Sequence, residues 1–246
     1  MSQLEIRSVS HWFGGLQALK DVTFDTHDEI LGLIGPNGAG KTTLFNVISG
    51  FIVPTSGEVR FNGKAIHRLR ADQTVRLGLA RTFQIVKPFA SLTVEENVLV
   101  GLGMPYYPTS AALYQRYRTR SNLDQVEQIL AKVHLTDYRS AQAAKLPIGL
   151  LRRLEIARAL ATHPKLLLLD EPAAGLVAQE AEELAALVRD LYAQGLHIIL
   201  IEHNMRFAMN LCHRIVVLAQ GEIIAQGNPT EIQNNEKVIN AYLGQE

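Results

Sequence analysis

A glycine-rich loop after a fully apolar run constrains the fold of this chain more than any other feature. The apolar run Ile30–Ile34 reads as a buried strand, and a helix through Leu44, Val47 and Ile48 is expected shortly after it. The segment that joins them consists of a glycine, four further residues and then Gly-Lys-Thr, which is the spacing of a phosphate-binding loop. The residues of this loop are Gly35, Pro36, Asn37, Gly38, Ala39, Gly40, Lys41 and Thr42.

This loop has the residue types needed to hold a polyphosphate. Glycines let successive backbone N–H groups face one concavity, and the helix that follows adds the positive end of its dipole. We expect Lys41 to reach the β- and γ-phosphates of ATP, Thr42 to ligate Mg²⁺ and the Thr43 hydroxyl to meet the α-phosphate. The alternative is a glycine-rich turn with a surface lysine. It is disfavoured because strand, loop and helix follow one another in the order that the motif requires.

Two carboxylates end a second apolar run. Residues 166–169 are all leucine, and Asp170 and Glu171 follow them. Because ligands of open α/β sheets collect at the carboxyl ends of strands, we expect this strand to lie beside the phosphate loop. Asp170 is predicted to hold Mg²⁺ through water, and Glu171 to act as general base or to orient the attacking water. The alternative is an ordinary strand end with two solvated acids.

Charge and composition restrict the partners and the compartment. The chain has 246 residues, with 24 lysines and arginines against 24 acidic residues, so a broad nucleic-acid-binding face is disfavoured. Cys212 is the single cysteine, which fits a reducing compartment and a small core residue. We find no secretory signal pattern and no apolar run approaching the roughly 18 residues of a membrane span. A membrane role is therefore expected from outside the bilayer.

Apolar runs and helical patterns alternate as is typical of an α/β sheet with crossover helices. An early antiparallel part is predicted, its last strand closed by an Asn62-Gly63 turn. Helical patterns replace strands over about residues 91–163, beginning with Thr93 and Glu96 as a capping box and including a loop over residues 101–110 with Pro105 and Pro108. The expected strands are residues 4–9, 19–26, Ile30–Ile34, 58–61, 166–169, His197–Ile201 and 215–219.

With these motifs, the sequence resembles the ATP-binding subunit of an ABC transporter over almost its whole length. The resemblance implies the P-loop NTPase fold of the α/β class: an ABC cassette with a RecA-like mixed sheet as core, an antiparallel β subdomain and an inserted helical subdomain. It implies one ATP-binding domain over residues 1–246. About residues 1–90 and 164–246 would form the nucleotide-binding core, and about residues 91–163 the helical subdomain with the signature helix.

The resemblance also assigns three residues that would mean little alone. Gln84, after Arg-Thr-Phe, matches the glutamine loop, which in the family senses Mg²⁺ and the attacking water and signals to the membrane subunit. His203 matches the switch histidine that contacts the γ-phosphate, and Phe13, before two glycines, matches the aromatic residue that stacks on adenine. The implied catalytic residues are thus Lys41, Gln84, Glu171 and His203, and the implied Mg²⁺ ligands are Thr42, Gln84 and Asp170.

The family's signature sequence, Leu-Ser-Gly-Gly-Gln at the start of a helix, is altered here. Only Leu146 and Gly149 match, and Pro147, Ile148 and Leu150 replace the other residues. In this family two ATPase subunits close head to tail, so the signature of one subunit faces the nucleotide of the other. The resemblance therefore suggests an asymmetric pair, in which this chain's Lys41 and Glu171 face an intact signature from a non-identical subunit. The alternative is that Gly149 and the helix dipole suffice and both sites hydrolyse ATP.

Several segments resemble the ATPases of importers of branched-chain and other hydrophobic amino acids. That subgroup implies a second, non-identical ATPase subunit, two membrane permease subunits and an extracytoplasmic solute-binding protein. It places the chain peripherally at the cytoplasmic face of the plasma (inner) membrane, with no nucleic acid as partner. The segments are residues 13–16, 32–46, 81–84, 201–205 and 239–244.

Other functions stay open at this point. Urea and short-amide importers and the lipopolysaccharide exporter have similar ATPases, and the transported ligand does not touch this subunit. Soluble ABC ATPases that act on ribosomes or DNA usually join two cassettes or insert long coiled coils, for which 246 residues with one phosphate loop leave no room. A regulatory half that hydrolyses poorly is a third alternative, against which Glu171 and His203 speak.

Overall fold

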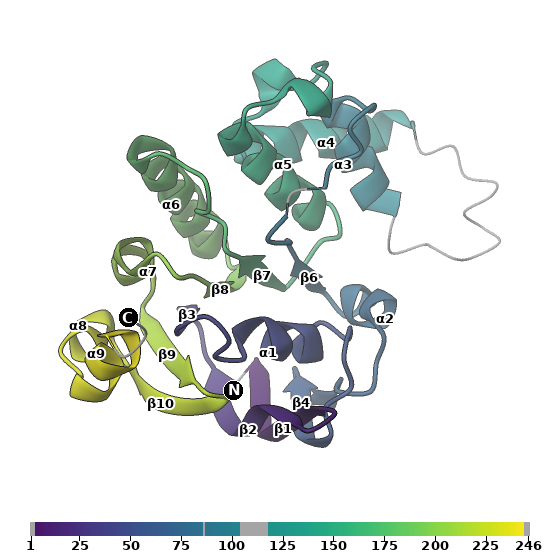
Figure 1. Ribbon diagram of the computed structural model, residues 1–246. Helices are drawn as coiled ribbons and strands as arrows, with labels where there is room; N and C mark the ends of the chain where they lie inside the picture. The colour runs from purple at the N-terminus through teal and green to yellow at the C-terminus, as the bar shows by residue number, and fades with distance from the viewer. Residues whose placement is uncertain (1–2, 86, 104–117, 244–246) are drawn as a thin grey trace.

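Two β-sheets and a set of helices make up the molecule, seen in a computed structural model that describes residues 3–85, 87–103 and 118–243 (Figure 1). One sheet is antiparallel and has the order β2-β1-β4-β5. The other is mixed and has the order β10-β9-β3-β8-β7-β6, with β10 antiparallel to β9 and the other neighbours parallel. The strands are β1 (Leu4–Phe13), β2 (Leu16–Thr26), β3 (Ile30–Ile34), β4 (Ser56–Phe61), β5 (Lys64–Ala65), β6 (Leu79–Arg81), β7 (Leu166–Asp170), β8 (His197–Ile201), β9 (Arg214–Ala219) and β10 (Glu222–Gly227).

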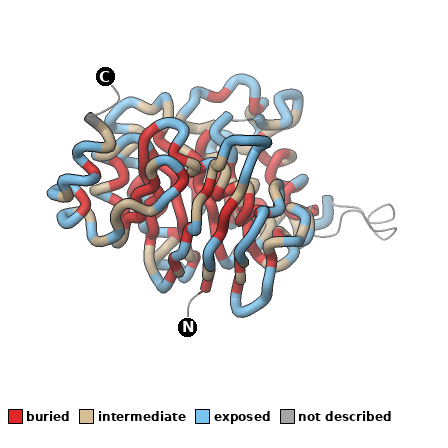
Figure 2. Tube along the Cα trace, turned by 60° about the horizontal axis from the view of Figure 1, so that its bottom comes forward, coloured by how far each residue is buried: buried red, intermediate tan, exposed pale blue. Residues whose placement is uncertain are grey.

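Strands β3, β7 and β8 in the middle of the mixed sheet are buried on both faces, which is why their sequences are almost continuous apolar runs. Alternate side chains enter two different cores. Leu167 and Leu169 of β7 belong to a core shared with most of the helices, and Leu166 and Leu168 belong to a core shared with the antiparallel sheet. Figure 2 shows these strands as a buried interior enclosed by more exposed segments. The pleat of each strand thus holds two layers together.

Helices cover both sides of the mixed sheet. α1 supplies apolar residues to the core that contains the antiparallel sheet, and α3 to α9 supply theirs to the other core. Two 3₁₀ turns, Thr136–Tyr138 and Ala143–Lys145, lie between α4 and α5. The helices are α1 (Lys41–Ile48), α2 (Ala71–Arg76), α3 (Val94–Gly103), α4 (Arg120–Lys132), α5 (Ile148–Leu160), α6 (Ala178–Ala193), α7 (Met205–Leu211), α8 (Pro229–Gln233) and α9 (Glu236–Leu243).

Helices α3, α4 and α5 gather at the end of the molecule away from the antiparallel sheet (Figure 1). The capping box at the start of α3 is confirmed, because the Thr93 N–H donates to Glu96 Oε2 (2.8 Å) and the Glu96 N–H donates to Thr93 Oγ1 (3.2 Å). Gly101 lets α3 approach α5, since a Cβ at this position would lie 2.6 Å from the Arg158 carbonyl oxygen. This contact fixes α3 against α5.

The predicted P-loop α/β fold and the expected strands are present, and the Asn62-Gly63 turn joins β4 to β5 with positive φ at both residues. Two details of the sequence interpretation are wrong. The loop expected from residue 101 begins later, because α3 continues to Gly103; Pro105 and Pro108 lie outside the described residues, as does Gly244 at the chain's end. The strand with the acidic end is not beside the strand of the phosphate loop, because β8 pairs with both and separates β7 from β3.

Cys212 is buried, as expected, and its sulfur fills space opposite Gly32 of β3. Burial raises the pKa of its thiol. A search of the described helices finds none with the length and apolarity needed to span a bilayer.

Candidate functional site

The phosphate loop connects β3 to α1 and is shaped by glycine. Gly40 has φ of +101° and a Cβ there would lie 2.6 Å from the Ala18 carbonyl oxygen, so only glycine fits without strain. Gly40 is also the N-cap of α1, and no side chain caps this helix. The N–H groups of the first turn are therefore directed at the cleft in front of the loop, where they favour an anion.

Lys41 folds back over the loop. Its Nζ donates to the carbonyl oxygens of Gly35 (2.6 Å) and Pro36 (2.9 Å), and the residue is 7% exposed. Burial lowers the pKa of Lys41, while the nearby carboxylates of Glu171 and Asp170 counteract this shift. The ammonium is thus held at the rim of the loop, near the two acids.

A cleft of about 710 Å³ lies in front of the loop and gathers most of the residues that the sequence singled out. Phe13 lines it from the end of β1, and Gln84 and Glu171 line it from the segments that follow β6 and β7. The cleft combines an anion-binding loop with carboxylate and amide groups, which suits a nucleotide and its hydrolysis. From the loop and α1 it is lined by Asn37, Gly38, Ala39, Gly40, Lys41, Thr42 and Thr43.

Glu171 directly follows β7 and is contacted from the segments that follow β6 and β8. Gln84 Nε2 donates to Glu171 Oε2 (2.9 Å), and His203 Nδ1 lies 3.4 Å from the same oxygen. The backbone of Glu171 has φ of +48°, an uncommon conformation for a residue other than glycine. Its N–H donates to the Ile201 carbonyl oxygen (3.0 Å), which ties this conformation to the end of β8. Gln84, Glu171 and His203 are thus brought together as one cluster.

Asp170 lies behind this cluster and is ion-paired. Its Oδ2 accepts a hydrogen bond from Arg81 Nη2 at 2.7 Å, and the two side chains are 4% and 6% exposed. The Thr82 hydroxyl accepts a hydrogen bond from the backbone N–H of Asp170 (3.2 Å). Because one of its carboxylate oxygens is bonded to Arg81, Asp170 would reach a metal ion in the cleft through its other oxygen or through water.

The donor set at the cleft suits a hard cation. Thr42 is exposed at its rim, and the side-chain oxygens of Thr42, Gln84 and Asp170 are the ligand type that Mg²⁺ prefers. A cluster of three or more histidine, cysteine, aspartate or glutamate side chains placed for a metal does not occur within residues 3–85, 87–103 and 118–243.

Phe13 lines the same cleft as Glu171. Its ring is 49% exposed and meets the ring of His11 edge-on, with 4.6 Å between centroids. An exposed aromatic face beside a phosphate-binding loop suits stacking with a base. Leu16, 69% exposed on β2, adds an apolar side chain next to it.

The altered signature lies outside this cleft. α5 begins at Ile148 with Pro147 as its N-cap, so the helix start has no hydroxyl that accepts from its first turn. Leu146 is buried, and the backbone of Gly149 lies against Glu180 of α6, where a Cβ would be 2.9 Å from Oε1. Leu146 and Gly149 therefore contribute to the packing of α5 on this chain and are not joined to its own phosphate loop.

Two arginines at the site were not predicted by the sequence interpretation. Arg81 pairs with Asp170, and a cation at the end of the otherwise apolar β6 is the signal that could have revealed it. Arg152 of α5 donates to the carbonyl oxygens of Gln84 (3.0 Å) and Ala174 (3.3 Å), although it is 6% exposed. It joins α5 to the loops on both sides of Glu171. Nothing in its local sequence marks these distant partners.

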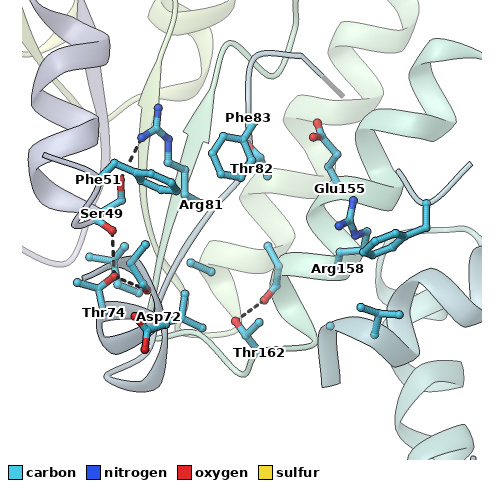
Figure 3. A pocket seen from close by; sticks show the side chains of 18 residues that line it. Ser49, Phe51, Asp72, Thr74, Arg81, Thr82, Phe83, Glu155, Arg158 and Thr162 are labelled. Carbon is cyan, nitrogen blue, oxygen red and sulfur yellow. Dashed lines mark hydrogen bonds between the residues drawn. The ribbon is translucent and has the colours of Figure 1, made fainter. Parts of the chain in front are cut away.

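A second hollow, of about 380 Å³, separates α1 and α2 from α3 and α5. We call it the aromatic groove, after the exposed rings of Phe51, Phe83 and Phe89 that line it together with Val100. Figure 3 shows Ser49 and Phe51 on one wall, Glu155 and Arg158 on the other, and Phe83 between them. Thr82 and Phe83, the two residues before Gln84, are part of the groove's lining.

Glu155 gives one wall of the aromatic groove a titratable group. Burial raises the pKa of its carboxyl from 4.5 to about 7, although Arg152 lies 3.5 Å away and Arg158 is close. The Arg158 guanidinium stacks over the ring of Phe89 at 4.9 Å and donates to the Lys87 carbonyl oxygen (3.0 Å). The charge of this wall therefore depends on pH near neutrality.

Sequence comparison finds family models along most of the chain. A model described as ABC transporter matches residues 19–174, and a model described as branched-chain amino acid ATP-binding cassette transporter matches residues 222–246. The high-affinity branched-chain amino acid transport ATP-binding protein LivG of Salmonella typhimurium is 42% identical, with all of both chains covered. The corresponding protein BraF of Pseudomonas aeruginosa is 39% identical, with 98% of each chain covered.

Solved structures agree with this result. The ADP conformation of an ATP-binding cassette of an ABC transporter superposes with a TM-score of 0.90, at 31% identity and with all of both chains covered. A nucleotide-free ATP-binding cassette from an ABC transporter gives the same TM-score at 32% identity, again over both whole chains. The likeness therefore extends to the complete arrangement of sheets and helices.

Replacing Glu155 by glutamine is predicted to change how stability depends on pH. The folded chain keeps the Glu155 proton up to about pH 7, whereas the unfolded chain releases it near pH 4.5. The folded state therefore loses stability relative to the unfolded state as pH rises through this window. The difference in the free energy of unfolding, E155Q minus wild type, should therefore rise by about 3 kcal/mol between pH 4.5 and pH 7. Above pH 7 this difference should be constant.

Urea denaturation at a series of pH values measures this difference. E182Q, which changes an exposed carboxylate of α6, is the matched control and should follow the wild-type curve. Parallel curves for E155Q and the wild type would contradict a raised pKa at Glu155.

Proposed function

The chain belongs to the ABC transporter family as an ATP-hydrolysing subunit, and we propose that the transporter it energises imports branched-chain or other hydrophobic amino acids. The full-length identity of about two-fifths to LivG, together with the intact cluster around Glu171, carries this proposal. The names of the relatives give the substrate class, and the cluster gives the reaction. Urea or amide import and lipid export remain the alternatives that the test must separate.

The roles proposed for the cleft residues follow from their positions. Phe13 stacks on the adenine, and the N–H groups of the loop and of α1 bind the phosphates. When nucleotide binds, the Lys41 ammonium exchanges its hydrogen bonds to two carbonyl oxygens for bonds to the β- and γ-phosphates. The exchange is favourable because the phosphates are negatively charged. Thr42 and Gln84, with Asp170 behind them, hold Mg²⁺, which neutralises charge on the phosphates when it is bound.

Glu171 is proposed as the base that orients and deprotonates the attacking water. The bond from Gln84 fixes one carboxylate oxygen, and His203, 3.4 Å from the same oxygen, would contact the γ-phosphate. A carboxylate held by two neighbours loses little orientational freedom when the water arrives. Arg81 holds Asp170 in place through the buried ion pair.

For the membrane partner, we propose that a short segment of a permease subunit occupies the aromatic groove. The groove exposes three phenylalanine rings and a valine, and apolar surface of this kind is typical of a protein interface. It lies between the part that holds nucleotide and the helical group of about residues 91–163, which we propose as a moving subdomain. Such a position lets a change at Gln84 reach the permease.

ATP binding is proposed to close two ATPase subunits around the γ-phosphates, and hydrolysis to reopen them. The coupling is the difference in affinity for the γ-phosphate between the open and the closed state. Extracytoplasmic solute-binding protein and two permease subunits complete the assembly, with this chain at the cytoplasmic face. The helix start at Pro147, without a capping hydroxyl, supports the further proposal that the second ATPase subunit is non-identical.

The function is tested on the complex purified with its membrane partners in vesicles. ATP hydrolysis should be stimulated by a binding protein loaded with leucine, isoleucine or valine, and not by one loaded with urea or a short amide. K41A should lower the stimulated rate about 100-fold or more, because it removes the cation that faces the phosphates. Stimulation by the urea-loaded protein alone, or full activity of K41A, would overturn the assignment.

Asymmetry of the ATPase pair is tested by replacing the proposed catalytic glutamate with glutamine in one subunit at a time. E171Q in this chain should lower ATP hydrolysis by about 100-fold or more, because it removes the general base from the site with the intact signature. The equivalent change in the partner should leave most of the activity. Equal losses of ATP hydrolysis in the two variants would refute the asymmetric arrangement.

Charge placed in the aromatic groove should weaken permease binding. V100E puts a carboxylate among the exposed rings, and an unpaired charge in an apolar interface should cost at least about tenfold in affinity for the permease. Nucleotide affinity should not change. I239E, on the exposed face of α9, is the control; equal retention of the permease by V100E and I239E would show that the groove is not its binding place.

A further inference from the structure

A fully buried carboxylate joins the two loops that carry Glu171 and His203. Glu202 follows β8 directly and is 0% exposed. Its Oε1 accepts a hydrogen bond from the Ala173 N–H (2.9 Å), and its Oε2 accepts one from the Asn204 N–H (3.3 Å). One oxygen therefore serves the loop after β7 and the other serves the loop after β8.

This carboxylate is an unusual choice for a buried position. Among the described residues its hydrogen-bond partners are two backbone amides, and it forms no ion pair. Burial raises the pKa of Glu202, and the bonds from the Ala173 and Asn204 amides partly oppose this shift. A buried acid without a cation costs more free energy than an apolar side chain of the same size would. Its presence therefore points to a role other than filling the core.

The two amides belong to segments that set the geometry of the catalytic cluster. Ala173 lies two residues after Glu171, whose carbonyl oxygen accepts from the Ala174 N–H (3.1 Å) in the same tight turn. Asn204 follows His203 and caps α7 through its side chain, which accepts from the Phe207 N–H (3.1 Å). A shift of either amide would change the distance between Glu171 Oε2 and His203 Nδ1, which is 3.4 Å.

The positive φ of Glu171 also needs such support. A residue other than glycine at φ of +48° is strained, and it keeps this conformation only when the surroundings hold the backbone on both sides. The Ile201 carbonyl oxygen holds the N–H of Glu171, and Glu202 holds the backbone two residues later. Both supports come from the end of β8, directly before His203.

We propose that Glu202 is a positioning residue for ATP hydrolysis. Its carboxylate links the Ala173 amide to the Asn204 amide, and so keeps Glu171 and His203 at a fixed separation around the γ-phosphate. Glu202 is fully buried, so it acts through the two loops that its carboxylate joins. The inference rests on the proposed roles of Glu171 and His203.

The test is E202Q in the complex with its membrane partners. The amide has one acceptor oxygen, so one of the two N–H bonds is lost while the shape is kept. We expect kcat for ATP hydrolysis to fall at least about tenfold, because small displacements of catalytic groups cost large factors in rate. The KM for ATP and the affinity for ADP should stay within about twofold, since the phosphate loop is not part of the link. E202L should lower kcat further.

E29Q is the matched control. Glu29 is also a largely buried carboxylate that accepts from a backbone amide, that of His27 (3.1 Å), but it lies at the opposite end of β3 from the phosphate loop. E29Q should lower the melting temperature and leave kcat unchanged. If E202Q behaves like E29Q, or if kcat and nucleotide affinity fall together, the positioning role is refuted.

Failure of this inference differs from failure of the proposed function. A wild-type complex without ATPase activity would reject the function, whereas an active wild type with an equally active E202Q would reject only the role of Glu202. Should E202Q and E202L not fold, amide hydrogen exchange of the wild-type complex decides. Peptides containing Ala173 and Asn204 should become protected together when a non-hydrolysable ATP analogue is added, and independent protection would overturn the link.

Discussion

The parallel pairing of β3, β8 and β7 is the constraint on which the rest of the site depends. It places the carboxyl ends of these three strands at one edge of the sheet, and each end continues into a loop that carries chemistry. The phosphate loop follows β3, Glu171 follows β7 and His203 follows β8. Because both faces of the sheet are covered, a slip of one residue would move every side chain of a strand out of the core that fits it and into the other core. The register that buries the core therefore also aligns the catalytic loops.

The sequence allowed the strands, the phosphate loop and the acidic strand end to be predicted because each is a local pattern. Four leucines before Asp170 predict a buried strand whatever lies next to it, and glycine spacing predicts a turn of the backbone. The order of the strands was beyond such reasoning, and β8 in fact stands between β3 and β7. Neighbour relations are decided by how helices cross over the sheet, which no short stretch of sequence records.

The same distinction separates the site residues that were predicted from those that were not. Lys41 and Glu171 belong to recurring motifs. Arg81, by contrast, pairs with Asp170, 89 residues later, and Arg152 donates to Ala174, 22 residues later. Gln84 and His203 meet Glu171 only because three separate segments converge. A buried charge is recognisable in a structure by what it touches, whereas in a sequence it is one charged residue among 48. The supporting residues of a site are thus harder to predict than the residues they support.

The turn that follows Glu171 is held by two charged side chains of opposite sign. Glu202 takes the N–H of Ala173 from the side of β8, and Arg152 donates to the carbonyl oxygen of Ala174 from α5. A displacement of α5 relative to the sheet therefore pulls on one end of this turn while the other end stays anchored. The turn therefore couples the position of the helical group relative to the sheet to the conformation of Glu171. In such an arrangement, a movement of α5 can change the position of Glu171, the proposed base, while the phosphate loop stays in place.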